Sequence, residues 1–110
     1  MIRNRTKGFV IAEKARFARS IFAKGTGLMF RKKPDYGLVF EFSREKMIPL
    51  TMMFMLCSID VLFLDKDRKV VEIARLKPFR DYMPKKKAMF VVELPVGAIG
   101  KTRVGDLIEF

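Results

Sequence analysis

Apolar residues recur in the first part of the chain at the spacing of an α-helix. On one face between residues 11 and 22 lie Ile11, Ala15, Ala18, Ile21 and Phe22. Arg16, Arg19 and Ser20 point away from that face. The pattern predicts one short amphipathic helix with a basic outer face, ended by Gly25 and Gly27.

Beyond these glycines the pattern changes to short runs rich in Val, Ile and Phe, bounded by Pro, Gly or charged residues. Such runs are typical of β-strands, and nearly continuous apolar runs are typical of strands buried on both faces. A polar turn at residues 65–68 separates two of them. The predicted strands cover residues 38–42, 52–57, 59–64, 70–77, 90–94 and 107–110.

About six strands and one early helix in 110 residues leave no crossover helices for a doubly wound fold. We expect a mostly β, β-rich α+β protein, folded as a small antiparallel β-barrel or rolled sheet, because closure hides the edges of apolar strands. No linker or repeat divides the chain, so residues 1–110 are expected to form one domain. In it, residues 1–16 are a basic lead-in and residues 17–110 are the core.

Composition excludes many kinds of chemistry. The chain has no His and only one Cys, which removes imidazole bases, Ser-His and Cys-His pairs, internal disulfides and multi-cysteine metal sites. We therefore predict no metal site and no cofactor. Gln is absent and Asn occurs once, a bias that indicates a thermophilic source.

The apolar stretches are too short or too interrupted to cross a membrane. The most hydrophobic one, residues 48–64, is broken by Pro49, Thr51, Ser58 and Asp60. After the basic N-terminus, the apolar run 8–12 is also too short for a signal peptide. These features predict a cytoplasmic protein without membrane insertion.

Positive charge is concentrated at the start of the chain. The formal net charge is +11, of which residues 1–33 carry +9. This segment and a lysine run downstream could contact phosphates of a nucleic acid or another anionic partner, or could be a solvated face. The candidate contacts are Arg16, Arg19, Arg31, Lys32, Lys33, Lys85, Lys86 and Lys87.

Three other features could carry chemistry. Asp60 stands in an apolar run, where it could be a general acid or base or a structural carboxylate paired with an Arg. The face shared by Met53, Met55 and Cys57 offers soft donors for monovalent copper, but gap-filling core is the preferred interpretation. The stretch 25–27, Gly-Thr-Gly, lacks a phosphate-binding pattern and is interpreted as a helix stop.

Several separated blocks together resemble domain-of-unknown-function family 192, also called uncharacterised protein family 0127. Residues 25–31, G-T-G-L-M-F-R, are similar to its G-L-M-x-R block, and residues 37–40 to its G-M-L-F strand. Residues 52–65 are similar to its central methionine strand, and residues 92–97 followed by 105–106 to its closing L-E-x-x-A-G … G-D block. Many bacterial relatives have a W-M-x-N-T-x-x-P-L-D segment, of which this chain keeps Met52 and Asp60.

The resemblance implies a compact, mostly β fold in an archaeal-type cytoplasmic member of the family, and it implies no particular activity. Met29, Arg31, Asp60 and Asp106 carry the resemblance and are the residues expected to line any shared site. The leading hypothesis is a binding or interaction module. The alternatives are a nucleic-acid-associated protein using residues 1–33 and an enzyme using Asp60 as general acid or base.

Overall fold

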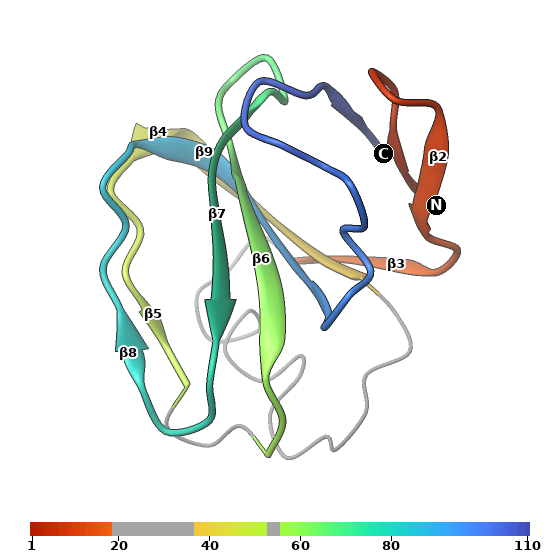
Figure 1. Ribbon diagram of the computed structural model, residues 1–110. Helices are drawn as coiled ribbons and strands as arrows, with labels where there is room; N and C mark the ends of the chain where they lie inside the picture. The colour runs from red at the N-terminus through yellow and green to blue at the C-terminus, as the bar shows by residue number, and fades with distance from the viewer. Residues whose placement is uncertain (19–36, 53–55) are drawn as a thin grey trace.

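The computed structural model describes residues 1–18, 37–52 and 56–110, and throughout these residues the regular secondary structure is β (Figure 1). No helix is present in them. The strands are β1 (Ile2–Asn4), β2 (Phe9–Ala12), β3 (Ala15–Ala18), β4 (Gly37–Lys46), β5 (Leu50–Thr51), β6 (Ile59–Leu64), β7 (Val70–Leu76), β8 (Asp81–Tyr82), β9 (Ala88–Pro95) and β10 (Ile108–Glu109).

The described strands form three sheets. The largest has five strands in the order β3-β4-β9-β6-β7, beside a three-stranded sheet β10-β1-β2 and the pair β5-β8. All pairs are antiparallel except β3 with β4. The mostly β prediction is confirmed, but none of these sheets closes into a barrel, because β3 and β7 are opposite edges of the five-stranded sheet.

The helix predicted from residue 11 onward is wrong over the residues that the structure describes. Residues 11 and 12 end β2, and residues 15–18 form β3, which pairs in parallel with the start of β4. Phe17 is 63 % exposed and contacts the Phe110 ring at a centroid distance of 6.1 Å. Here pairing with a distant strand overrides a local apolar period of 3.6. Residues 19–22 of the predicted helix lie outside the described part.

The strand predictions succeed where the apolar pattern is strongest. The predicted span 59–64 coincides with β6, whose six residues are all buried, and four other predicted spans overlap β4, β7, β9 and β10. The run 52–57 does not form the expected strand in its described part. Met52 follows β5 and is buried, whereas Leu56 is 46 % exposed and lies in a bend. Met53 and Met55 lie outside the described residues.

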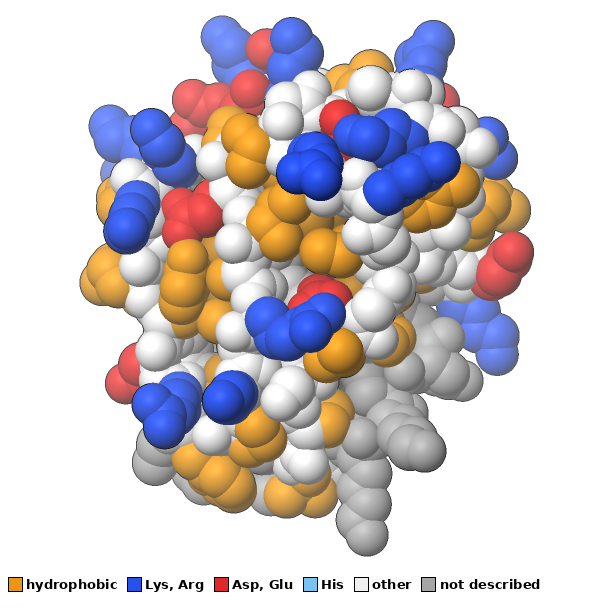
Figure 2. All heavy atoms as spheres, viewed as in Figure 1, with side chains coloured by type: hydrophobic (Ala, Val, Ile, Leu, Met, Phe, Trp, Pro, Cys, Tyr) orange, Lys and Arg blue, Asp and Glu red, His pale blue; other side chains and the backbone are white. Residues whose placement is uncertain are grey.

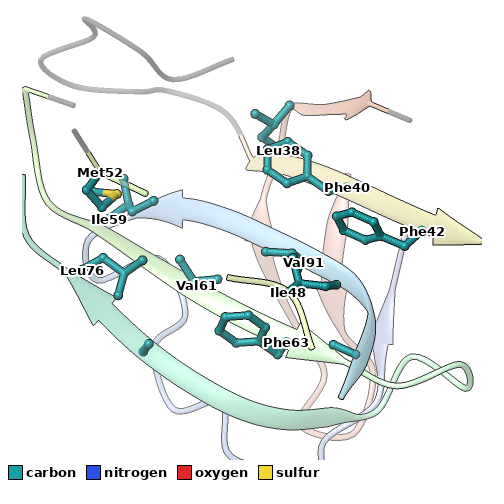
Figure 3. Packing of buried hydrophobic residues seen from close by; sticks show 12 residues of the cluster. Leu38, Phe40, Phe42, Ile48, Met52, Ile59, Val61, Phe63, Leu76 and Val91 are labelled. Atoms are coloured by element: carbon teal, nitrogen blue, oxygen red, sulfur yellow. The ribbon is translucent and has the colours of Figure 1, made fainter. Parts of the chain in front are cut away.

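The five-stranded sheet separates two apolar clusters. On one face pack residues of β4, β6 and β9 together with Ile48 and Met52 (Figure 3). On the other face pack alternate residues of the same strands together with Ile2, Ile11 and Ile108 of the three-stranded sheet. We call these faces cluster A and cluster B. Because side chains alternate along a strand, neighbouring residues of β6 and β9 belong to different clusters.

Gly37, at the start of β4, gives a test of this packing. A Cβ atom there would overlap Ile2 Cδ1 and lie 2.9 Å from Leu94 Cδ2. Both neighbours are fully buried, so they have little room to move. We expect Gly37→Ala to lower the free energy of unfolding by about 2 kcal/mol through overpacking.

Chemical denaturation measures this loss. Ser43→Ala, on an exposed position of the same strand, is the control and should change stability by less than about 0.5 kcal/mol. Equal stability of Gly37→Ala and the wild type would show that this contact is not tight.

Candidate functional site

Asp60 lies on β6 with its carboxylate fully partnered. Its side chain shares the cluster B face with Leu94 and Arg75, which are its cross-strand neighbours on β9 and β7. Arg75 Nε donates to Asp60 Oδ1 at 2.7 Å and Arg75 Nη2 donates to Asp60 Oδ2 at 3.2 Å. This two-point ion pair meets the requirement of a carboxylate that is only 1 % exposed.

Asp60 also holds the start of the connection from β9 to β10, residues 96–107, which we call the C-terminal loop. The backbone N–H of Gly97 donates to Asp60 Oδ2 at 2.8 Å. Gly97 has a φ of +90°, a conformation that favours glycine. The buried acid therefore fixes the point where the chain leaves β9.

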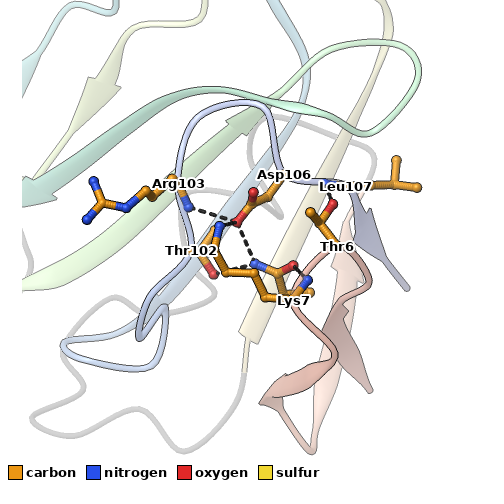
Figure 4. A network of polar contacts seen from close by, with 7 residues as sticks. Thr6, Lys7, Thr102, Arg103, Asp106 and Leu107 are labelled. Atoms are coloured by element: carbon orange, nitrogen blue, oxygen red, sulfur yellow. Dashed lines mark hydrogen bonds and ion pairs between the residues drawn. The ribbon is translucent and has the colours of Figure 1, made fainter.

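Asp106 holds the other end of the same loop, in a polar network (Figure 4). Its Oδ2 accepts hydrogen bonds from Asn4 Nδ2 at 2.9 Å, from the Arg103 N–H at 2.9 Å and from Lys7 Nζ. Asn4, which is fully buried, also donates to Thr102 Oγ1 at 3.0 Å. The Lys7 ammonium is the main cause that lowers the pKa of Asp106 to about 2, against an opposing effect of burial, with help from Asn4 and Arg103.

The two carboxylates expected in one site thus have separate partners. Asp60 is opposite Arg75, whereas the carbonyl oxygen of Asp106 accepts from the N–H of Val70, the first residue of β7. Five strand positions between Val70 and Arg75 correspond to about 17 Å. Met29 and Arg31 lie outside the described residues, so a site that includes them remains a prediction.

The Asp60–Arg75 pair should respond asymmetrically to mutation. Asp60→Ala leaves the Gly97 N–H without its acceptor, and we expect it to lower the free energy of unfolding by about 2 kcal/mol. The Arg75 side chain is 59 % exposed, so water can take its place beside Asp60, and Arg75→Ala should lower the free energy of unfolding by less than Asp60→Ala does.

Urea unfolding of both variants measures the difference. If Arg75→Ala lowers the free energy of unfolding more than Asp60→Ala does, the ion pair with Arg75 matters more for stability than the hydrogen bond to the loop.

Glu93, on the central strand β9, is an acidic residue that the sequence did not single out as a site residue. Its cross-strand neighbours are Leu38 on β4 and Val61 on β6, both members of cluster A. The side chain is partly exposed, and no hydrogen bond or ion pair to it is found among the described residues. Desolvation by the surrounding protein raises the pKa of Glu93 to about 8. A single acid between Val92 and Leu94 was the available signal in the sequence.

A second acid on the cluster A face is fully engaged. Glu72 of β7 lies opposite Phe63 and accepts hydrogen bonds from the Tyr82 hydroxyl and from the N–H groups of Lys85 and Lys86. The bond to Glu72 is the main cause that raises the pKa of Tyr82 to about 12. Glu93 therefore differs from Glu72, Asp60 and Asp106 in being an acid without a protein partner in the described structure.

The candidate basic contacts do not gather into one patch in the described part of the chain. Arg16 pairs with Leu38 at the start of β4, whereas Lys87 precedes Ala88, which pairs with Lys46 at the end of β4. Eight strand positions between Leu38 and Lys46 correspond to about 26 Å. On the face shown in Figure 2, Lys and Arg side chains are spread in several groups. Arg19, Arg31, Lys32 and Lys33 lie outside the described residues.

A shallow groove of about 490 Å³ lies between β7 and the C-terminal loop. Ile73 of the edge strand β7 and Val104 give it apolar surface, and Lys101 and Arg103 are exposed beside them. In the same part of Figure 2, hydrophobic side chains lie between groups of Lys and Arg. This combination suits an anionic partner with apolar side chains.

The described residues contain no group of three or more His, Cys, Asp or Glu side chains that could hold a metal ion. They also contain no helix long and apolar enough to cross a membrane.

Comparison with known proteins shows the family of this chain. Residues 2–110 match the model of a family of uncharacterised proteins, DUF192, described as "Uncharacterized ACR". The chain belongs to the DUF192 family. The resemblance deduced from the separated blocks is confirmed, and the match includes the lead-in residues 2–16 as well as the predicted core.

Three relatives of this DUF192 chain are archaeal proteins named UPF0127. One from Pyrococcus horikoshii is 43 % identical, over 100 % of this chain and 98 % of its own length. One from Pyrococcus furiosus is 41 % identical over 97 % and 95 %, and one from Thermococcus sibiricus is 40 % identical over 100 % and 74 %. These thermophilic sources agree with the amide-poor composition.

Two solved structures share the fold at a TM-score of 0.78 and 24 % identity. One, titled a putative transcription regulator, is from Sinorhizobium meliloti and is matched over 86 % of this chain and 79 % of that chain. The other, a protein of unknown function from Novosphingobium aromaticivorans, is matched over 87 % and 74 %. At this identity they show the fold of the DUF192 chain and nothing of its ligand.

Proposed function

We propose that this DUF192 protein is a non-catalytic binding module whose ligand site surrounds Glu93 on the cluster A face. The observation that carries the proposal is an acid that is partly exposed, flanked by Leu38 and Val61, and without a protein partner in the described residues. Desolvation raises the pKa of Glu93 to about 8, and a titratable group with a pKa perturbed in this way is a candidate functional residue. A ligand that pairs with this carboxyl would explain an acid at this position.

Catalysis by Asp60 has less support. Both of its oxygens accept hydrogen bonds, from Arg75 and from Gly97, and these hold the sheet and the C-terminal loop. A general acid or base has to reach the proton of a substrate, and this carboxylate is 1 % exposed. The geometry therefore favours a structural role for Asp60.

An NMR titration with n-hexanol, a neutral apolar probe, tests the position of the site. We expect saturable shifts of the Leu38 and Val61 methyl signals and of the Glu93 amide signal. Shifts scattered over the surface, or no shifts, would remove the proposed site. The charge-matched variants Glu93→Gln and Glu109→Gln separate the two positions, because Glu109 is a surface residue of β10 with only a long contact to Arg3 at 3.9 Å.

A second candidate function is binding of an acidic extended peptide in the groove beside β7. It is favoured by the exposed Lys101 and Arg103 next to the apolar Ile73 and Val104. An apolar floor suits a peptide better than a nucleic acid, for which stacking aromatic residues would be expected. The transcription-regulator title of one structural neighbour is a reason to include a nucleic acid in the test.

Charge reversal distinguishes the two partners. The double variant Lys101→Glu/Arg103→Glu should abolish binding of a Glu-Val repeat peptide, while Lys85→Glu/Lys87→Glu, with the same change of charge, should retain it. If an RNA of about 20 nucleotides binds with a steep salt dependence and the peptide does not bind, nucleic acid is the favoured partner instead.

A further inference from the structure

The open edge of β7 indicates how the groove beside it would hold a peptide, so this inference rests on the second candidate function. β7 is an edge strand of the five-stranded sheet, and the C-terminal loop lies beside its first residue. The N–H of Val70 donates to the Asp106 carbonyl oxygen at 2.9 Å, and the Gly105 N–H donates to the Val70 carbonyl oxygen at 2.8 Å. The loop therefore takes the place of a further strand at Val70.

Beyond Val70, the backbone of β7 next directs its hydrogen-bonding groups outward at Ile73. Residue pairs of an antiparallel ladder alternate between pairs that exchange hydrogen bonds and pairs that do not. Val70 is bonded to the loop instead of to Leu64, its partner on β6, so Leu62, two positions back on β6, does not bond to β7 either. An extra residue of β7 between Val70 and Glu72 places Ile73 opposite Leu62. The N–H and C=O of Ile73 therefore point away from β6, and no backbone partner for them is found among the described residues.

A groove lies at this position of the edge. It has a volume of about 490 Å³ and separates Ile73 from residues 100–104. Ile73 is partly exposed and Val104 is 62 % exposed, so both side chains can be reached from solvent. The groove thus leaves space beside the strand edge that the loop covers only at Val70.

The charges beside the groove have one sign. Lys101 and Arg103 are exposed, two positions apart in the loop, and neither has an ion pair in the part of the chain that the structure describes. The Arg103 side chain points away from the polar network around Asp106 (Figure 4). Asp106 is the one acid of the loop, and its carboxylate already accepts from Lys7. Acidic side chains of a bound segment would therefore meet two unpaired cations.

We propose that an acidic segment of a partner protein binds here as an added strand of the five-stranded sheet. Its backbone would exchange hydrogen bonds with Ile73, and its acidic side chains would pair with Lys101 and Arg103. An open sheet edge binds extended peptides in this way, with affinity from main-chain hydrogen bonds and specificity from alternate side chains. Because successive side chains of a strand point to opposite faces, the acids are expected at every second position of the segment.

Hydrogen exchange of the Ile73 amide, measured by NMR with the Glu-Val repeat peptide as probe, tests this pairing. At saturation we expect the exchange of the Ile73 N–H to slow by about tenfold or more, because the peptide carbonyl accepts from it. A second Glu-Val repeat, methylated at every backbone nitrogen, keeps the charges but has no N–H to donate. It should bind at least about tenfold more weakly than the first.

Ile73→Pro removes the donor from the protein, and Ile73→Ala is the matched control. Proline is tolerated on an edge strand where the N–H faces away from the sheet. Ile73→Ala loses most of the side chain but keeps the N–H, so we expect Ile73→Pro to bind the peptide about tenfold more weakly than Ile73→Ala does. If Ile73→Pro does not fold, the exchange measurement on the wild type decides.

The outcomes separate the added strand from the groove itself. If the peptide binds through Lys101 and Arg103 but the Ile73 amide exchanges as fast as before, the strand pairing is wrong and the function proposed for the groove stands. Equal binding of the methylated and unmethylated peptides would also contradict the pairing alone. If neither peptide binds, or only RNA binds, the strand pairing and the peptide function of the groove both fail.

Discussion

Replacing Asp106 by Ala is expected to be the most destabilising single change discussed for this protein, lowering the free energy of unfolding by about 4 kcal/mol. The carboxylate is buried and accepts from Asn4, Lys7 and the Arg103 N–H at once. Its removal leaves the fully buried Asn4 amide and a backbone N–H short of an acceptor, and it detaches the C-terminal loop from the turn after β1. Thermal denaturation should show a midpoint lower by roughly 20 °C.

The acid dependence of Asp106 gives a second measurement. Its pKa is lowered to about 2 in the folded protein, so its contribution is present above the ordinary Asp pKa near 4 and is lost as the pH falls through about 2. The stability difference between wild type and Asp106→Asn should therefore be constant above about pH 4 and shrink toward pH 2.

The control for Asp106 is Asp67→Ala, at an exposed turn position, which should change stability by less than about 0.5 kcal/mol. A loss from Asp106→Ala no larger than that of Asp67→Ala would mean that the network in Figure 4 does not hold the loop.

The strands were predictable because a strand buried on both faces is a continuous run of apolar residues in the sequence. In β6, from Ile59 to Leu64, every residue is buried, and five of the six are apolar. In β9, Phe90, Val92 and Leu94 face cluster B, as their alternation indicates. Such patterns need only the neighbouring residues along the chain, so they can be interpreted without knowledge of the fold.

The start of the chain was mispredicted for a physical reason. Ala15 and Ala18 fit a helical face, but residues 15–18 pair with β4, whose first residue is Gly37. That pairing joins positions about twenty residues apart in sequence, and no local period records it. The barrel prediction erred similarly, since closure depends on which strands become neighbours.

Some of the polar residues with buried partners could also be identified from the sequence, and others could not. An acid in an apolar run identified Asp60 as buried, and the structure adds that Arg75 and Gly97 are its partners. Asn4 was missed although it is the one Asn of the chain, because its partners Thr102 and Asp106 lie at the other end of the sequence. Glu93 was not chosen as a site residue because it alternates with apolar residues like a solvent-facing position, and only the register places it beside Leu38 and Val61.

Glu93 should make this protein less stable as the pH rises from about 4.5 to 8. The folded-state pKa of about 8 is higher than the ordinary value of 4.5, so the folded protein holds this proton more tightly than the unfolded chain. The free energy of unfolding then has its full value below pH 4.5, falls as pH approaches 8, and is level above. Allowing for partial exposure of the side chain, the decline amounts to about 3 kcal/mol.

Glu93→Gln removes the charge that has to be buried, and we expect it to abolish this decline and to be more stable than wild type by about 3 kcal/mol at pH 9. Urea unfolding of both proteins at pH values from about 5 to about 9 measures the effect. The control is Glu109→Gln, whose free energy of unfolding should fall with pH as that of the wild type does. A Glu93→Gln curve parallel to that of the wild type would mean that Glu93 ionises at its ordinary pKa. In that case an unpartnered acid at this point of β9 would no longer require a ligand, and the binding function proposed for the cluster A face would lose its main support.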